Sequence, residues 1–373
     1  ALVAQKAGRP EQAKAANEAA LAIARTKGPN AEVDVLADLA LVEAELGALD
    51  IASGHLRRAE AMALKELGAS HPKLASIQHD LGTIAFRRAK YADAEKLFRD
   101  ALAIRERALG DDDVRVATTV QMVGLALTAQ GMLEAAQPHL ERALKILEQR
   151  LGAEHPDVAN ALNDIAGAYH RAGEFQRELD TGRRALAIRE KALGPEHPDV
   201  GQSLVNIAIA SKALGKWDVV VPNYQRAIAI FSKSYGADNA STAITHLNFA
   251  EALRAQSKLD DAAREYEAAR VVFVKQFGAD HPLLAHIWNG VGQLELARGR
   301  VAEAVPILER AVALREKDPG DPTALAESRF ALARALGKAS PVAVGLAGQA
   351  RDAFRVAGKS FAKQVDEIEA WLK

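Results

Sequence analysis

A glycine recurs at a fixed interval of 42 residues along this chain, each time after a stretch similar to "RALAIREKALG". The spacing is 42 in all six intervals between Gly68, Gly110, Gly152, Gly194, Gly236, Gly278 and Gly320. An earlier unit ends at Gly28, 40 residues before Gly68. Self-similarity at a period of roughly 20–50 residues is typical of repeat architectures, in which each unit packs only on its neighbours.

The residues inside each period predict two helices. Fourteen residues past each repeat-ending glycine, the position is always small: Gly82, Gly124, Ala166, Ala208, Ala250 and Gly292. Twenty-one residues past it, four repeats have a glycine that indicates a turn: Gly131, Gly173, Gly215 and Gly299. Apolar residues recur at helical spacing on both sides of this turn. We therefore expect an all-α fold, a right-handed α-solenoid of stacked antiparallel helix pairs whose first helices line a concave face.

Composition is consistent with helices and excludes several kinds of site. Apolar residues make up 49% of the chain but aromatic residues only 5%, and the chain has no cysteine, which excludes disulfides and thiolate metal sites. The net charge of -1 indicates no global attraction to nucleic acid or an anionic membrane. No run approaches the roughly 18 apolar residues of a membrane helix. We expect no nucleic-acid partner, no membrane segment in this chain and a cytoplasmic location.

The repeated positions carry a resemblance to a known family. The small and glycine positions Gly124, Gly131, Ala136 and Ala143 resemble those of tetratricopeptide repeats. The 42-residue spacing, with "ALAIREKALG" followed by "HPDV", is similar to the longer variant found in kinesin light chains and many bacterial proteins. The resemblance implies one solenoid over residues 1–358 and a capping helix over residues 359–373. Its units are a partial repeat 1–28 and repeats 29–68, 69–110, 111–152, 153–194, 195–236, 237–278, 279–320 and 321–358.

Two parts of the chain depart from this pattern. Glu178 and Gly182 occupy positions of the second helix that are usually Ala and a large apolar residue, so this helix is expected to be loosened or to present a polar edge. The "AESRFALARAL…ARDAF…EIEAWL" ending is similar to the C-terminal repeat region of bacterial receptor-type serine/threonine kinases, although no kinase motif is present. The absence of an initiator Met and the start in helical pattern suggest a fragment of a longer protein.

The repeated "EHPDV" motif offers a choice between chemistry and architecture. Three residues past each glycine lie His71, Asp113, His155, His197, Asn239, His281 and Thr323. Asp, Asn and Thr are preferred helix N-caps, and the proline that often follows is favoured at the first helical position. Equivalent caps are separated by roughly 16–20 Å at usual helix spacings, whereas zinc ligands lie within about 2.1 Å of one ion. We predict caps and expect no metal, no cofactor and no catalytic residue. An enzyme that uses these histidines remains an alternative, which would lose its activity on His155→Asn and His197→Asn.

The resemblance also implies a binding groove along the first helices of the pairs. The candidates are amide and basic residues that the family's geometry places on the concave face: Asn163, His170, Arg171, Asn206, Lys212, Asn248, Arg254 and Asn289. Asn can bond both N–H and C=O of an extended peptide, and basic residues can pair with a carboxylate. Asp80, Asp164 and Glu251 interrupt any uniform positive potential, so a merely solvated face stays open as an alternative.

These observations favour a non-catalytic protein–protein interaction module or scaffold. We expect its concave groove to bind a peptide segment or a partner protein of unknown identity, and we expect the chain to be a monomer. One alternative is the C-terminal regulatory or sensor region of a bacterial serine/threonine kinase or another multidomain signalling protein. Another is self-assembly through stacked ends or through the faces of the second helices.

Overall fold

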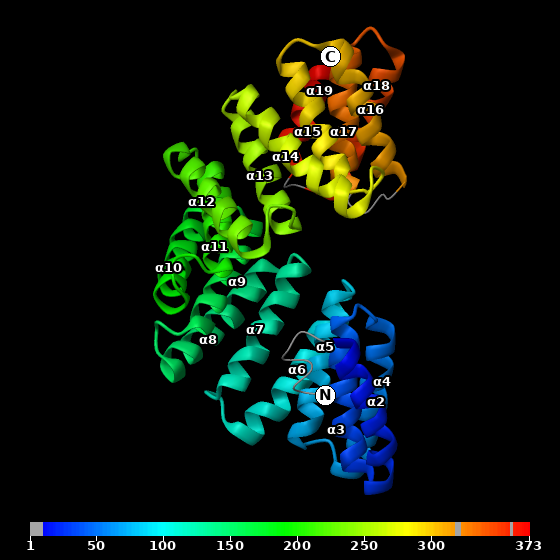
Figure 1. The fold of residues 1–373 in the computed structure, drawn as a ribbon, viewed down its shortest axis with the longest axis vertical. Helices are drawn as coiled ribbons and strands as arrows, with labels where there is room; N and C mark the ends of the chain where they lie inside the picture. The colour runs from blue at the N-terminus through cyan, green and yellow to red at the C-terminus, as the bar shows by residue number, and fades with distance from the viewer. Residues whose placement is uncertain (1–9, 318–321, 359–360) are drawn as a thin grey trace. The chain divides into compact units, whose positions relative to one another are not determined.

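The computed structural model describes residues 10–317, 322–358 and 361–373, which form 18 α-helices arranged in pairs (Figure 1). No strand occurs in these ranges, so the predicted all-α class with stacked antiparallel helix pairs is confirmed. Gly320, the start of the partial first repeat and the start of the predicted cap lie outside the described residues.

Two compact units divide the chain, residues 1–193 and residues 194–373. The first contains α2 (Pro10–Lys27), α3 (Pro29–Glu45), α4 (Leu49–Leu67), α5 (Pro72–Arg87), α6 (Tyr91–Leu109), α7 (Val114–Ala129), α8 (Leu133–Leu151), α9 (Pro156–Ala172) and α10 (Phe175–Leu193). The second contains α11 (Pro198–Ala213), α12 (Trp217–Tyr235), α13 (Ala240–Ala255), α14 (Leu259–Phe277), α15 (Leu284–Ala297), α16 (Val301–Lys317), α17 (Pro322–Leu336), α18 (Pro341–Ala357) and α19 (Ala362–Leu372). We refer to them as unit 1 and unit 2.

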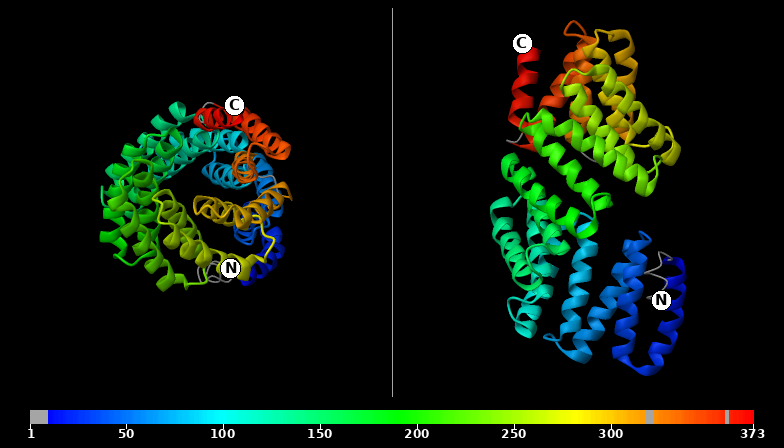
Figure 2. Two further views of the ribbon diagram at one scale, coloured as in Figure 1. Left: turned by 90° about the horizontal axis from the view of Figure 1, so that it is seen from above. Right: turned by 60° about the vertical axis from the view of Figure 1, so that its left-hand side comes forward.

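Within each unit, every helix packs against the next one in chain order (Figure 2). From α3 onward the helices alternate between an A-helix and the B-helix that follows it, ending with the pair α17 and α18. Most A-helices also contact the following A-helix of their unit, which aligns these helices along one face; the contacting pairs are α3 with α5, α7 with α9, α11 with α13, α13 with α15 and α15 with α17. We call this surface the A-helix face of each unit. One solenoid over residues 1–358 remains a prediction.

The repeated motif caps helices, as predicted. The Nδ1 atoms of His71, His155 and His197 each accept the backbone N–H two residues later, at 3.1, 3.2 and 3.2 Å. Asp113 and Asn239 do the same with a side-chain oxygen, each at 2.8 Å. Each bond satisfies a backbone donor that would otherwise have no partner in the first helical turn.

Two positions of the cap prediction need correction or refinement. Thr323 is not a cap, because α17 already begins at Pro322 and Thr323 is its second residue. His281 accepts the N–H of Leu283 at 3.2 Å, although the regular helix begins one residue later at Leu284.

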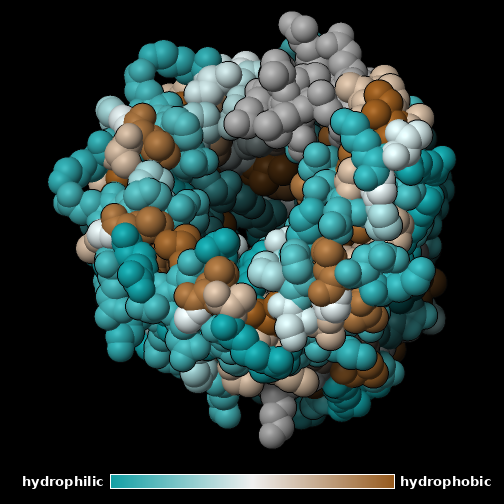
Figure 3. Space-filling view, turned by 90° about the horizontal axis from the view of Figure 1, so that it is seen from below, coloured by the Kyte–Doolittle hydropathy of each residue, from teal (hydrophilic) through white to brown (hydrophobic). Residues whose placement is uncertain are grey.

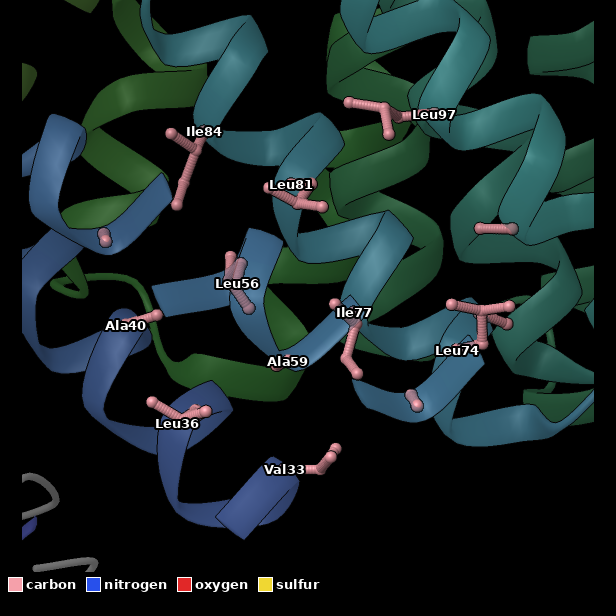
Figure 4. Close-up of a cluster of buried hydrophobic side chains, with 14 of the residues drawn as sticks. Val33, Leu36, Ala40, Leu56, Ala59, Leu74, Ile77, Leu81, Ile84 and Leu97 are labelled. Atoms are coloured by element: carbon pink, nitrogen blue, oxygen red, sulfur yellow. The ribbon is translucent and has the colours of Figure 1, made fainter. Parts of the chain in front are cut away.

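The small A-helix positions bring paired helices into close contact. A Cβ atom added at Gly82 would lie 2.6 Å from Phe98, and one added at Gly124 would lie 2.7 Å from Leu140. Such distances leave no room for a methyl group. These large B-helix residues are therefore buried directly against the A-helix backbone, and close packing of this kind builds the core. Figure 4 shows part of the resulting core of unit 1, where side chains from several successive helices meet.

The departures at Glu178 and Gly182 compensate each other. Helix α10 runs its full 19 residues, so the expected loosening is not found. Glu178 occupies a position where other repeats have Ala or Val, and Gly182, one turn later, occupies one where they have Phe98, Leu140, Tyr224, Tyr266 or Leu308. Glu178 is only 5% exposed, and its carboxylate is 3.0 Å from Nδ1 of His170. The usual order of a small residue followed one turn later by a large one is thus reversed on this helix face.

Most turns between paired helices use a left-handed residue. Gly131, Gly173 and Gly299 have φ of 79, 73 and 77° there. Ala89 and Ser257 occupy the same position with φ of 57 and 59°. Residues with a Cβ atom are strained in this conformation.

The surface carries no extended apolar band on the face drawn in Figure 3, where apolar residues lie in small patches among hydrophilic ones. Among the described helices, none combines the length and apolar character needed to cross a membrane.

Candidate functional site

A cavity of about 440 Å³ opens on the A-helix face of unit 2. Its walls come from α13, α15 and α17, with further residues from α16, α18 and α19. Figure 1 labels these six helices in the part of the chain coloured from yellow-green to red. Three of the predicted groove residues, Asn248, Arg254 and Asn289, line it. The other lining residues are Leu247, Glu251, His286, Gln293, Arg315, Glu327, Phe330, Ala331, Arg334, Phe354, Gln364 and Glu367. The cavity is therefore rich in amide, basic and acidic groups.

The wall on α13 is fixed by a network around Glu251. Arg254 donates from Nη2 to Oε2 of Glu251 at 2.8 Å, and the Tyr266 hydroxyl of the neighbouring B-helix donates to Oε1. Burial lowers the pKa of the Arg254 guanidinium, but Glu251 and Tyr266 outweigh that effect and leave it above its ordinary value. Burial, and then the charge of Glu251, raises the pKa of the Tyr266 hydroxyl. The guanidinium stays charged and held in place.

A second arginine enters the cavity from a B-helix. Arg315 is 6% exposed, and its Nη2 is 3.1 Å from Nδ1 of His286 on α15, a geometry in which the guanidinium donates and the imidazole accepts. Arg334 of α17 lies 4.0 Å from the carboxylate of Glu367 on α19. Helix α19, which lies in the range predicted as a cap, thus also contributes to the cavity wall.

Two buried polar atoms on the predicted groove residues of this cavity have no hydrogen-bond partner among the described residues. They are Oδ1 of Asn289, a residue that is 7% exposed, and Nε of Arg254. One is an acceptor and the other a donor, and a buried polar atom without a partner costs about 1–3 kcal/mol. These two cavity residues therefore contribute one unpaired donor atom and one unpaired acceptor atom.

The comparison with known protein families agrees with the repeat pattern. A family model described as "Tetratricopeptide repeat" matches five stretches, residues 33–107, 73–149, 114–191, 199–270 and 241–317, which together cover most of the chain. This chain belongs to the tetratricopeptide repeat family. No curated protein sequence matched it.

Solved tetratricopeptide-type structures share the fold at low identity. BtubC (BKLC) from P. vanneervenii has a TM-score of 0.54 and 23% identity, covering 61% of this chain and 92% of its own. The nearly identical TPR-like repeats assigned to a Podosopora anserina kinesin light chain have a TM-score of 0.50 and 24% identity, covering 56% and 99%. The Rap conjugation gene regulator of plasmid pLS20, solved with the Phr* peptide, has a TM-score of 0.54 and 14% identity, covering 79% and 78%. At these identities the likeness concerns the fold.

The other predicted groove residues of this tetratricopeptide repeat protein lie outside the cavity. Asn206 and Lys212 are half-buried on α11, where Asn206 accepts a bond from Gln202 at 3.0 Å. In unit 1, Asn163, His170 and Arg171 lie on α9, and His170 faces Glu178. The chain's sequence therefore pointed to eight residues, of which three share one cavity.

The tetratricopeptide pattern did not predict the residues that complete the cavity, but Arg315 carried a signal. It occupies a B-helix position that holds the buried residues Leu147, Phe231 and Phe273 in three other repeats and Arg105 and Arg189 in two. A charge at a core position needs a polar partner. His286 supplies that partner.

The A-helix face of unit 1 has two neighbouring half-buried ionisable residues of its own. Burial lowers the pKa of His79 to about 4, with a smaller effect from Arg105, and burial raises the pKa of Asp80 to about 6 against the opposing charge of Arg105. Among the described residues, no group of three or more His, Asp or Glu side chains is arranged to hold a metal ion.

Proposed function

We propose that this chain is a scaffold that binds an extended peptide segment of a partner protein on the A-helix face, with the polar cavity of unit 2 as its main contact. Membership of the tetratricopeptide repeat family supports a protein-interaction scaffold. The family is generally non-catalytic, which supports a binding role rather than an enzymatic one.

One observation carries the proposal: the open acceptor on Asn289 and the open donor on Arg254 belong to the same cavity. A peptide unit offers one N–H and one C=O, so it can satisfy both atoms at once. Arg315 and Arg334 add positive charge for an acidic side chain or a terminal carboxylate of the same peptide. A Rap regulator of similar fold was solved with a peptide, which supports peptide binding by this architecture.

The proposal is tested by selecting peptides on the immobilised chain from a phage-displayed library of random heptapeptides. A recovered peptide is then synthesised with a fluorophore and titrated by anisotropy against the wild type and the Asn289→Leu variant. We expect Asn289→Leu to weaken binding about fivefold to tenfold, because it removes one buried hydrogen-bond partner at similar volume.

A matched variant shows whether the loss is local. Asn223→Ala removes an amide from helix α12, where it bonds to its own helix at Val219, and should leave binding unchanged. Equal affinity of the wild type and Asn289→Leu, with folding intact by circular dichroism, would contradict the proposed cavity contact.

Contacts outside the cavity belong to the same proposal. Asn206 and Lys212 would extend the peptide path along α11, and Asn163, His170 and Arg171 would serve a contact on unit 1. A monomeric state, a cytoplasmic location and the kinase-associated context remain predictions. An intact gene that encodes only this segment would contradict the last of them.

A further inference from the structure

A cleft of about 620 Å³ in unit 1 is lined by none of the residues predicted to bind peptide. It is bounded by the first half of α8, the last half of α9 and the turns beside them. The lining residues are Gly131, Met132, Leu133, Glu134, Ala135, Gln137, Leu140, Glu141, Ile165, Ala168, Tyr169, Ala172 and Glu174. Its walls are mainly apolar, it includes three carboxylates, and no lining residue is basic. Its volume falls within the range of about 300–1,000 Å³ that is usual for ligand pockets.

The cleft lies where one repeat has a short side chain in place of a long one. The residue immediately before the turn residue of each pair reads Arg88, Gln130, Ala172, Leu214, Gln256 and Arg298. Arg88 reaches back to Asp50 on the preceding B-helix with an N–O distance of 2.6 Å. Arg298 reaches back in the same way to Asp260. The side chain of Ala172 is only a methyl group, so it does not fill the space between its helix and the preceding B-helix that Arg88 and Arg298 fill in their repeats.

The carboxylate of such a pair is nevertheless present. Glu134 is the third residue after the left-handed residue Gly131, just as Asp260 is the third after the left-handed residue Ser257. Glu134 is exposed in the first turn of α8 and has no hydrogen-bond or ion-pair partner among the described residues. Glu134 is thus an exposed carboxylate at the cleft without the arginine that its equivalent Asp260 has.

A wall of the cleft already holds one guanidinium. Arg177 stacks on the Tyr169 ring with its Cζ atom 4.2 Å from the ring centroid. It donates to the Tyr169 hydroxyl at 2.8 Å and to Glu174 at 2.6 Å. Stacking together with forked hydrogen bonds is what distinguishes an arginine site from a lysine site.

We propose that this cleft is a docking site for an arginine side chain of a partner protein, followed by an apolar residue of the same segment. The guanidinium pairs with Glu134 as Arg298 pairs with Asp260 in the other unit. It lies at the C-terminal end of α9, where the helix dipole favours a cation. Leu133, Leu140 and Ile165 provide apolar contact for the neighbouring residue. This site is separate from the cavity of the proposed function.

The test uses two labelled peptides, acetyl-Gly-Leu-Arg-Leu-Gly-amide and its analogue with citrulline, which has the shape of arginine without the charge. Binding is measured by fluorescence anisotropy in low-salt buffer. We expect saturable binding of the arginine peptide and binding of the citrulline peptide that is weaker by about fivefold, since the positive charge that pairs with Glu134 is lost. Glu134→Gln should lower affinity for the arginine peptide by a similar factor and leave the citrulline peptide unaffected.

Ala172→Arg supplies the missing side chain from within and should abolish binding by filling the cleft. Ala313→Arg adds the same charge at an exposed position of α16 and serves as the matched control, with unchanged affinity expected. Equal binding of both peptides, no saturable binding, or unchanged binding by Ala172→Arg would overturn the proposal. Loss on Asn289→Leu instead would place the peptide in the cavity of unit 2 and also overturn it.

Discussion

The cavity of unit 2 and the cleft of unit 1 are made in opposite ways. In unit 2, Arg315 occupies a position that is apolar in three other repeats, and it bonds to His286 in the wall of the cavity. In unit 1, a long polar residue has been lost at Ala172, and its carboxylate partner Glu134 is left exposed. Because the repeat geometry fixes where each position lies, one substitution is enough either to build a site or to open one.

The contrast extends to charges. In unit 2, the carboxylate of Glu251 has two donors, Arg254 and Tyr266. On the A-helix face of unit 1, His79 and Asp80 are adjacent in the chain and half-buried, and both have strongly shifted pKa values. In unit 2, the hydrogen-bonded charges hold their side chains in place. In unit 1, the ionisable groups of His79 and Asp80 make the stability of the fold depend on pH.

The largest expected effect is therefore on the pH dependence of unit 1. The pKa of Asp80 is raised from 3.8 to about 6, so its protonated form favours folding at low pH and that stability is lost as pH rises through 6. The pKa of His79 is lowered from 6.5 to about 4, so its neutral form favours folding above pH 6.5 and that stability is lost as pH falls through 4. The two effects oppose each other between pH 4 and 6.

Single substitutions should expose each effect. Asp80→Asn leaves only the histidine, and we expect unfolding free energy to fall by about 2–3 kcal/mol between pH 7 and 4 relative to the wild type. His79→Gln leaves only the aspartate and should give a change of opposite sign. Urea unfolding at pH 7, 5.5 and 4 measures both, and parallel profiles for the two variants would refute the assignment.

A second comparison applies one substitution to both units. A Cβ at Gly290, beside the cavity of unit 2, would lie 2.4 Å from Tyr266, whereas a Cβ at Gly167 on α9 would meet nothing within 4 Å. Gly290→Ala should destabilise by about 1–3 kcal/mol through overpacking, and Gly167→Ala should stabilise by about 0.5–1 kcal/mol through helix propensity. Thermal unfolding checks both, and a stabilising Gly290→Ala would mean that Tyr266 can move without loss.

A third comparison concerns the turns, where both units should respond alike. Ala89 in unit 1 and Ser257 in unit 2 have φ of 57 and 59° at a position that is glycine in most other pairs. Ala89→Gly and Ser257→Gly should each stabilise by about 1 kcal/mol, because a left-handed conformation strains a residue with a Cβ atom. Thermal unfolding measures the shift, and a loss in either variant would show that these turns are not strained.

The fold followed from the sequence because its signals are local and repeated. The capping by His155 and His197, and the small positions at Gly82 and Gly124, depend on neighbours at fixed distances along the chain. Periodicity makes each such signal visible several times.

The sites followed only in part because they depend on exceptions to the period. Asn248, Arg254 and Asn289 were predicted from their positions on A-helices, but α16 and α19 complete the cavity from outside that pattern. The cleft at Ala172 was not predicted from the sequence. The significance of this alanine appears only in the structure, where Arg88 and Arg298 at the equivalent positions of other repeats form ion pairs with the preceding B-helix.

The packing of each helix on its neighbours in the chain also has a consequence for folding. Most native contacts close short loops, so a helix pair can form at little entropic cost and the next pair can add to it. Pairs near an end of such a stack open more readily than pairs inside it. A peptide held at once by α13, α15 and α17 would tie three successive pairs together. Opening any one of these three helix pairs would then require release of the peptide. With the peptide bound, the amide protons of the three pairs would therefore exchange with solvent at a common rate.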